Sequence, residues 1–170
     1  YYVENQICRI GVIMRIVVIS DSHRRSGNVS KILDAQQNAR HVFFLGDVTG
    51  DIDELMKFYP DKVFHTVSGN CDIFSSYPST DIAELYGHRI FFTHGHTLGV
   101  KYGTERLISA ARAAGCDIAL YGHTHVSKIL YEDGLYVVNP GSCAEPRDGG
   151  KSYAVIDIEK NGVMPIIIKI

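Results

Sequence analysis

The sequence predicts an α/β fold that ends in a series of antiparallel strands. Runs rich in β-branched residues alternate with helical patterns through the first two thirds of the chain, which is typical of βαβ units around a parallel sheet. From residue 126 onward, short apolar segments follow one another, with turn residues between most of them. A chain of 170 residues can bury a substantial core, and we expect one domain over 14–170.

Hydrophobic periodicity places the individual elements. Apolar, β-branched runs predict strands near 14–20, 41–45, 62–67, 89–93 and 117–121. Helical patterns lie between them, near 28–38, 51–58 and 103–114. The later strands are predicted in "VSKILYE", "LYVVNP", "SYAVIDIE" and "VMPIIIKI". Turn dipeptides predict hairpins between these strands, at Asp133-Gly134, Gly149-Gly150 and Asn161-Gly162.

Residues 1–13 are expected to be upstream or appended sequence, because "MRIVVISDSH" from Met14 reads as a clean first strand. Residues 7–20 briefly look like a signal peptide, but Arg9 and Arg15 interrupt the apolar run. No small-residue cleavage site precedes the acidic "DSH" either.

Composition and charge exclude several classes of function. A formal net charge of −2 gives no basic surface for nucleic acid or for an anionic membrane, and no apolar run approaches the length of a membrane span. The four cysteines form no C-x-x-C pair, so neither a disulfide framework nor a structural zinc site is expected. The simplest interpretation is a cytoplasmic protein with reduced thiols, and assembly into a homo-oligomer is left open.

Polar side chains follow the apolar runs at the points where the runs end. These endings are Asp21-Ser22-His23, Gly46-Asp47, Gly69-Asn70-Cys71-Asp72, His94-Gly95-His96, Gly122-His123-Thr124-His125 and Asn139-Pro140-Gly141-Ser142. Ligand sites of open α/β sheets lie outside the carboxyl ends of the strands. Turn and capping chemistry explains a single Asp or Asn, but it does not explain why five of the eight histidines gather here. The other three, His41, His65 and His88, are expected to be structural or surface groups.

The donors at these endings indicate a pair of metal ions. Carboxylate oxygens, an amide oxygen and imidazoles suit borderline divalent ions, with Mn²⁺ as first choice and Zn²⁺, Fe²⁺, Co²⁺ or Ni²⁺ as alternatives. Seven donors are too many for one ion and enough for two that share a carboxylate: Asp21, His23, Asp47, Asn70, His94, His123 and His125. Two divalent ions about 3.5–4 Å apart can clamp the attacking and leaving oxygens of a displacement at phosphorus.

The order of the motifs D-x-H, G-D, G-N-x-D, H-G-H and G-H-T-H resembles the calcineurin-like metallophosphoesterase superfamily. The resemblance runs from Met14 to the C-terminus. The short length and the late "NPGS" are most similar to a small bacterial and archaeal phosphodiesterase group, to which the retromer subunit of the same fold is related. The resemblance implies a four-layer αββα sandwich, in which two mixed β-sheets are flanked by helices and the metal pair lies at the strand ends.

The resemblance also implies a role for each residue. Asp21, His23 and His125 would hold the first ion, Asn70, His94 and His123 the second, and Asp47 would bridge them. Because the backbone turns after Gly122, His123 and His125 can serve different ions. The implied reaction is in-line attack of a metal-bridging hydroxide on a small phosphate ester, with Asp47, Asn70 and His96 as the catalytic residues. The alternative interpretation of His96 is a surface histidine at a strand end.

Substrate contacts are expected from Arg24, Cys71 and Asp72, although Arg24 is equally well read as a solvated surface charge. Many superfamily members carry a histidine where this chain has Cys71, so leaving-group protonation is in doubt. Asn139, Gly141 and Ser142 are expected at the pocket floor, and "NPG" is also ordinary turn chemistry. The alternatives to a phosphodiesterase are a phosphomonoesterase and a non-catalytic protein-interaction scaffold of the same fold, and the intact ligand set weighs against the scaffold.

Overall fold

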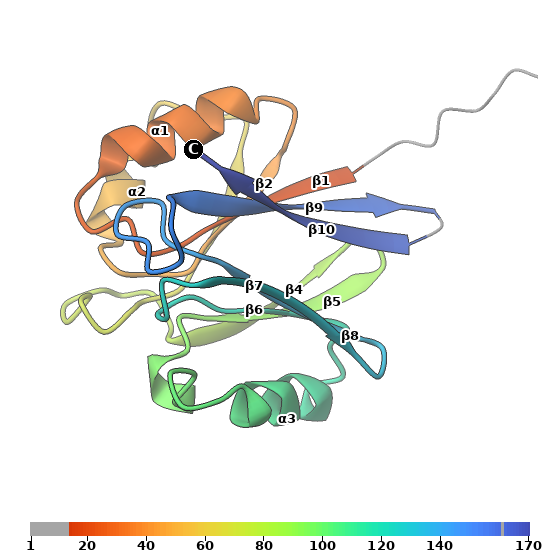
Figure 1. The fold of residues 1–170 in the computed structure, drawn as a ribbon. Coiled ribbons are helices and arrows are strands. Elements are labelled where there is room, and N and C mark those ends of the chain that lie inside the picture. Colours follow the sequence, from red (N-terminus) through yellow and green to blue (C-terminus); the bar gives the residue numbers. More distant parts are fainter. Residues whose placement is uncertain (1–13, 161) are drawn as a thin grey trace, which may run out of the picture.

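The computed structural model describes residues 14–160 and 162–170, which form four layers (Figure 1). Two five-stranded sheets pack face to face, with helices α1 and α2 on the outer side of one sheet and α3 on the outer side of the other. The expected αββα sandwich of two mixed sheets is therefore confirmed. The upstream segment expected over residues 1–13 lies outside the described residues.

The first sheet has the strand order β10-β9-β1-β2-β3. Its bounds are β1 (Met14–Ile19), β2 (His41–Phe44), β3 (Val63–Thr66), β9 (Ser152–Glu159) and β10 (Gly162–Lys169). β1, β2 and β3 run parallel, whereas β9 and β10 pair in antiparallel fashion. Both faces of β1 are buried, which explains its continuous apolar run: Ile16 and Val18 face the other sheet, and Val17 and Ile19 face the helices.

The second sheet has the order β4-β5-β6-β8-β7. Its strands are β4 (Thr80–Leu85), β5 (His88–Thr93), β6 (Ile118–Leu120), β7 (Ser127–Glu132) and β8 (Leu135–Pro140). The predicted hairpin at Asp133-Gly134 joins β7 to β8, and the φ angles of 46° and 81° at these residues suit a type I′ turn. β4 was not predicted, because "TDIAEL" is a partly exposed edge strand without an apolar run.

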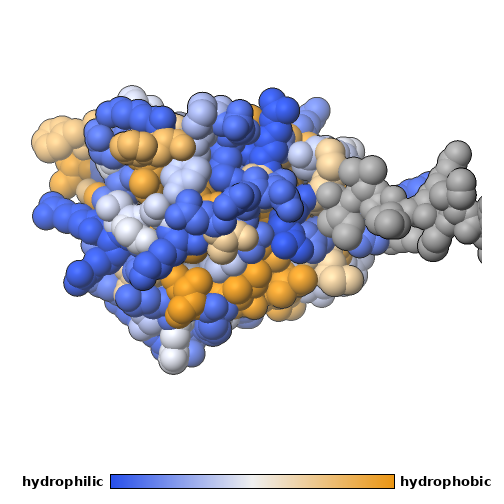
Figure 2. Space-filling view, turned by 90° about the horizontal axis from the view of Figure 1, so that it is seen from above, coloured by the Kyte–Doolittle hydropathy of each residue, from blue (hydrophilic) through white to orange (hydrophobic). Residues whose placement is uncertain are grey.

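The helices are somewhat shorter than expected. α1 (Ser26–Ala35) and α2 (Gly50–Met56) cover the first sheet, and α3 (Glu105–Ala113) covers the second. Each helix turns its apolar side chains inward, and the surface seen from the α1 side is mostly hydrophilic with a few hydrophobic patches (Figure 2). Within the described ranges, no helix has the length and apolar character needed to cross a membrane.

The hairpin predicted at Gly149-Gly150 is wrong. β8 belongs to the second sheet and β9 to the first, so residues 141–151 cross between the sheets and do not connect neighbouring strands. At the next predicted turn, β9 and β10 do pair in antiparallel fashion, although Asn161 itself lies outside the described residues. The crossing segment matters for the site, because it carries Ser142 and Glu145 past the strand ends that bear the predicted ligands.

Candidate metal centre

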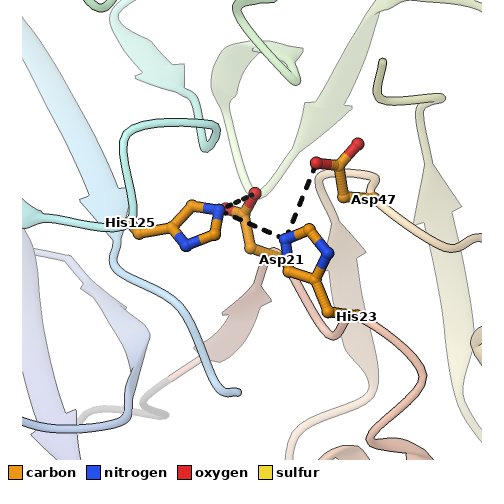
Figure 3. A group of neighbouring side chains, drawn as sticks. All are labelled: Asp21, His23, Asp47 and His125. Atoms are coloured by element: carbon orange, nitrogen blue, oxygen red, sulfur yellow. Dashed lines mark hydrogen bonds and ion pairs between the residues drawn. The ribbon is translucent and has the colours of Figure 1, made fainter. Parts of the chain in front are cut away.

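The loops after β1, β2 and β6 bring four of the predicted ligands into one group (Figure 3). His125 Nε2 lies 3.2 Å from His23 Nε2 and 3.2 Å from Asp21 Oδ1. His23 Nε2 also lies 3.7 Å from Asp47 Oδ2. Three of these residues follow strands of the first sheet, whereas His125 follows β6 of the second, so this group spans the two sheets.

A second group forms beside the first around His94, which follows β5. His94 Nε2 lies 3.1 Å from His123 Nδ1, 3.2 Å from Asn70 Oδ1 and 3.5 Å from Asp47 Oδ1. Asp47 therefore turns Oδ2 toward the first group and Oδ1 toward the second. All seven predicted ligands lie at one end of the sandwich, divided between two groups that share this carboxylate, with Asn70 placed in the second group by its contact with His94.

Main-chain carbonyls fix the orientation of two imidazoles. His94 Nδ1 donates to the carbonyl of Leu45 at 2.7 Å, and His125 Nδ1 donates to the carbonyl of Glu145 at 2.6 Å. Because a carbonyl oxygen only accepts hydrogen bonds, Nδ1 carries the proton in each neutral ring and Nε2 presents a lone pair to the site. This is the tautomer that a metal-ligating Nε2 requires.

The electrostatics of the first group favour a cation. Asp21 is fully buried, and its Oδ1 receives no hydrogen bond from a described residue. Burial alone would raise the pKa of this carboxyl, but the neighbouring His125 and His94 hold it below its ordinary value. Asp21 in turn raises the pKa of His125, so the space between the two side chains attracts positive charge. A divalent ion with oxygen and nitrogen ligands fits that space.

In the second group, His123 is suited to binding as a neutral ligand. Burial, together with His94 and Lys101, lowers the pKa of His123 to about 4. Its imidazole is therefore unprotonated near pH 7 and has a lone pair available. The residues present thus fit the two-ion site expected from the sequence, with mixed oxygen and nitrogen donors in each group.

The backbone is strained where the ligands emerge. Five of them have positive φ angles, namely Asp21 (55°), His23 (42°), Asp47 (60°), His123 (67°) and His125 (59°). The β-branched Val48, next to Asp47, has a φ of 76°. Such conformations cost about 1–3 kcal/mol each and persist only where the surroundings enforce them. The strain indicates that the fold holds these side chains in place at some cost in stability.

Asp72 supplies one of the enforcing contacts. Its Oδ2 accepts from the main-chain N–H groups of Asp47 (3.0 Å) and Gly69 (2.7 Å), and its Oδ1 accepts from those of Val48 (3.1 Å) and Thr49 (2.7 Å). Both oxygens are committed to the backbone, so we assign Asp72 to positioning Asp47 and withdraw the substrate contact expected from the sequence. Gly69 is necessary here, because a Cβ at this position would collide with the Asp47 carboxylate.

The family follows from comparison with known proteins. Residues 14–161 match the calcineurin-like phosphoesterase superfamily domain. The chain belongs to this superfamily. The phosphodiesterase YfcE of Escherichia coli K12 is 30% identical over 178 aligned positions, which cover 91% of each chain.

Solved structures agree with the superfamily fold. A crystal structure of a predicted phosphoesterase from Streptococcus pneumoniae TIGR4 has a TM-score of 0.79 and 27% identity, covering 92% of this chain and 90% of that chain. Vacuolar protein sorting 29 from Cryptosporidium parvum has a TM-score of 0.73 at 19% identity, covering 93% and 98%, and shares the fold. The resemblance to both the phosphodiesterases and the retromer subunit is confirmed.

The other expected site residues of this phosphoesterase-family chain surround the two groups. His96 begins the short 3₁₀ helix η1 (His96–Leu98), and its ring centroid lies 5.4 Å from that of His94 and 6.1 Å from that of His123, outside both ligand groups. Cys71 is exposed, and its main-chain N–H donates to Asp47 Oδ1 at 2.9 Å. Arg24 is exposed beside His23. Their roles toward a substrate remain predictions.

Several supporting contacts were not expected from the sequence. The sequence does not indicate that the carbonyls of Leu45 and Glu145 orient the two imidazoles, because every residue has a carbonyl. Ser22 Oγ lies 2.7 Å from Asp51 Oδ2 and donates to it, which ties the loop of Asp21 and His23 to α2. The weakly expected floor residues also have contacts: Ser142 Oγ donates to the carbonyl of Asp21 at 2.8 Å.

Proposed function

We propose that this protein is a phosphodiesterase that holds two divalent ions and hydrolyses a small phosphate ester. The observation that carries the proposal is the Asp47 carboxylate, whose two oxygens face separate groups of nitrogen and oxygen donors. The superfamily match and the likeness to YfcE support the reaction type. Mn²⁺ is our first choice of metal, and Zn²⁺, Fe²⁺, Co²⁺ or Ni²⁺ also suit these donors.

The chain's own contribution is to fix the donors and to position the ester. When bound, two divalent ions acidify water and neutralise charge on the phosphoryl oxygens. His94 and His125 keep their lone pairs directed at the site through their carbonyl contacts, and this lowers the reorganisation needed during reaction. Asn70 Oδ1 faces His94, so the amide oxygen is available as a ligand in the second group.

We assign the binding of the substrate's phosphate group to His96 and Arg24. Burial and the neighbouring His94 lower the pKa of His96, so it is mainly neutral near pH 7 and can donate a hydrogen bond to a phosphoryl oxygen. Arg24 is exposed beside His23, where a guanidinium can anchor a phosphate through two hydrogen bonds. Together with Asp47 and Asn70, His96 completes our proposed catalytic set.

The test is hydrolysis of bis(p-nitrophenyl) phosphate by the Mn²⁺-loaded protein and by Asp47→Asn. We expect the substitution to lower kcat/KM by at least about 100-fold, since even changes behind a metal ligand typically cost 10–100-fold. Asp61→Asn makes the same chemical change at an exposed position outside both ligand groups, and it should leave the rate within about twofold.

The monoester p-nitrophenyl phosphate, measured in parallel, distinguishes the reaction classes. A phosphodiesterase should hydrolyse the diester with the higher kcat/KM, and the reverse order would make the protein a phosphomonoesterase. Equal diester rates for the wild type and Asp47→Asn would contradict the proposal. Absence of hydrolysis of both esters with each of the five metals would favour the scaffold of the same fold.

A further inference from the structure

A hollow on the side of the second sheet is lined in part by the loop that carries His123 and His125. Its volume is about 360 Å³, and it is lined by residues 100–104 before α3, by Glu105 at the start of α3, by Tyr121 and Thr124, and by Val126 and Lys128 around the start of β7. Thr124 in this lining lies between the ligand candidates His123 and His125 in the chain, and the charge of Lys101, which also lines the hollow, acts on His123. Figure 1 shows the segment before α3 at the same end of the sandwich as the loops that carry the ligands.

Two lysines line this hollow without partners. Among the other lysines of the described chain, Lys57 and Lys169 form ion pairs and Lys62 donates to main-chain carbonyls, whereas Lys31, Lys151 and Lys160 have no such contact with a described residue. Lys101 and Lys128 have neither kind of contact with any described residue, and both are exposed. Two ammonium groups without partners beside a phosphoester site can bind a second anionic group of the substrate.

The remaining charge in the hollow does not cancel the lysines. Glu105 also lines it, and its carboxylate is folded against the main chain of Gly103 at the start of α3. The lysine side chains therefore leave the hollow net positive, although the whole chain carries a formal charge of −2. Tyr102 stands at the rim with 97% of its surface exposed and offers a face on which an aromatic group can stack.

We propose that this hollow binds a second phosphate carried on one ester arm of the substrate. The inference rests on the proposed phosphodiesterase function and narrows its substrate class to diesters in which one arm bears a further phosphate. In the bound complex, the reacting phosphoryl group lies at the two ligand groups and the additional phosphate lies between Lys101 and Lys128.

The test uses two esters that differ only in the second phosphate: the p-nitrophenyl ester of thymidine 5′-phosphate and the same ester with a 3′-phosphate. The wild type should show about tenfold higher kcat/KM for the 3′-phosphorylated ester, mainly through KM, because two exposed charge contacts contribute modestly. Raising the salt concentration should shrink this ratio. Lys101→Gln/Lys128→Gln should bring the ratio to about one.

The matched control is Lys31→Gln/Lys160→Gln, which removes two exposed lysines that do not line the hollow and should keep the tenfold ratio. A ratio of about one in the wild type would overturn the subsite. So would a ratio that survives in Lys101→Gln/Lys128→Gln.

Calorimetric titration with thymidine 3′,5′-bisphosphate and thymidine 5′-phosphate separates this inference from the proposed function. If neither ester is hydrolysed, but the bisphosphate binds about tenfold more tightly and loses that advantage in Lys101→Gln/Lys128→Gln, the subsite stands and the phosphodiesterase proposal fails. Equal affinities of the wild type for the two nucleotides would overturn the subsite, whether or not the esters are hydrolysed.

Discussion

At the scale of single residues, Cys71 stands where the family resemblance implies a histidine. Its main-chain N–H contacts Asp47 Oδ1, so the residue lies directly beside the carboxylate shared by the two groups. Burial, Asp47 and Asp72 raise the pKa of the thiol to about 11. An acid this weak is a poor proton donor to a departing alkoxide. In the proposed reaction the metal ions would activate the attacking water without help from this residue, so protonation of the departing alcohol is the step that Cys71 would serve poorly.

We therefore expect the rate to depend steeply on the pKa of the leaving group, with fast hydrolysis of nitrophenyl diesters and slow hydrolysis of alkyl diesters. Cys71→His should flatten this dependence. A well-placed general acid contributes about 10²–10⁴-fold, but Asp72 is committed to the backbone and cannot orient the new imidazole. We expect a gain of about tenfold on the poorest leaving groups, measured with a series of phenyl and alkyl diesters.

Cys71→Ser is the control for that series, because it removes the thiol without supplying an imidazole. It should leave the dependence as steep as in the wild type. If plots of rate against leaving-group pKa are parallel for the wild type and Cys71→His, position 71 has no part in leaving-group departure.

The residue scale also shows what a sequence can predict about a site. His94 and His125 could be predicted, because imidazoles that follow buried strands are rare enough to be informative. The carbonyls of Leu45 and Glu145 that orient them could not, since they depend on which main-chain atoms the fold brings near Nδ1. Asp72 was expected to contact the substrate, and only its contacts show that both of its oxygens face the backbone.

At the scale of elements, the loops after β2 and β3 work as one unit. Asp72, in the loop after β3, accepts hydrogen bonds from the main-chain N–H groups of residues 47–49 in the loop after β2. In that loop, Asp47 and Val48 have positive φ angles. Hydrogen bonds to a charged group contribute about 1.5–3 kcal/mol each. The carboxylate therefore offsets the strain of the loop that carries Asp47.

The substitution Asp72→Asn tests whether Asp72 stabilises the loop that carries Asp47. The amide can accept on one side only and turns an NH₂ group toward main-chain N–H donors on the other. We expect the free energy of unfolding to fall by about 2 kcal/mol and the affinity for Mn²⁺ to weaken, measured by urea denaturation and by calorimetry. Asp61→Asn should change neither quantity. Unaltered Mn²⁺ affinity in Asp72→Asn would show that Asp72 does not position Asp47.

Two parts of the fold were not predicted correctly, each for its own physical reason. β4 lies at a sheet edge and exposes much of its side-chain surface, so it needs no apolar run. Gly149-Gly150 looks like a hairpin turn locally, but the two strands that it separates belong to different sheets. Buried strands such as β1 were predicted closely, because burial on both faces leaves a continuous apolar run.

At the scale of the whole molecule, the site joins the two sheets. The first ligand group takes Asp21, His23 and Asp47 from the first sheet and His125 from the second. The second group takes His94 and His123 from the second sheet, with Asp47 and Asn70 from the first. Each ion would thus be held from both sheets, and both groups would depend on the packing of the inter-sheet core.

Whether this chain holds two ions that share Asp47 can be decided by counting the bound metal. After loading with excess Mn²⁺ and removal of the free metal, elemental analysis should give two equivalents per chain. The substitutions Asn70→Ala and His94→Ala each remove a donor of the second group only, so each should lower the count to about one. A wild-type plateau at one equivalent, left unchanged by Asn70→Ala and His94→Ala, would contradict the two-ion site.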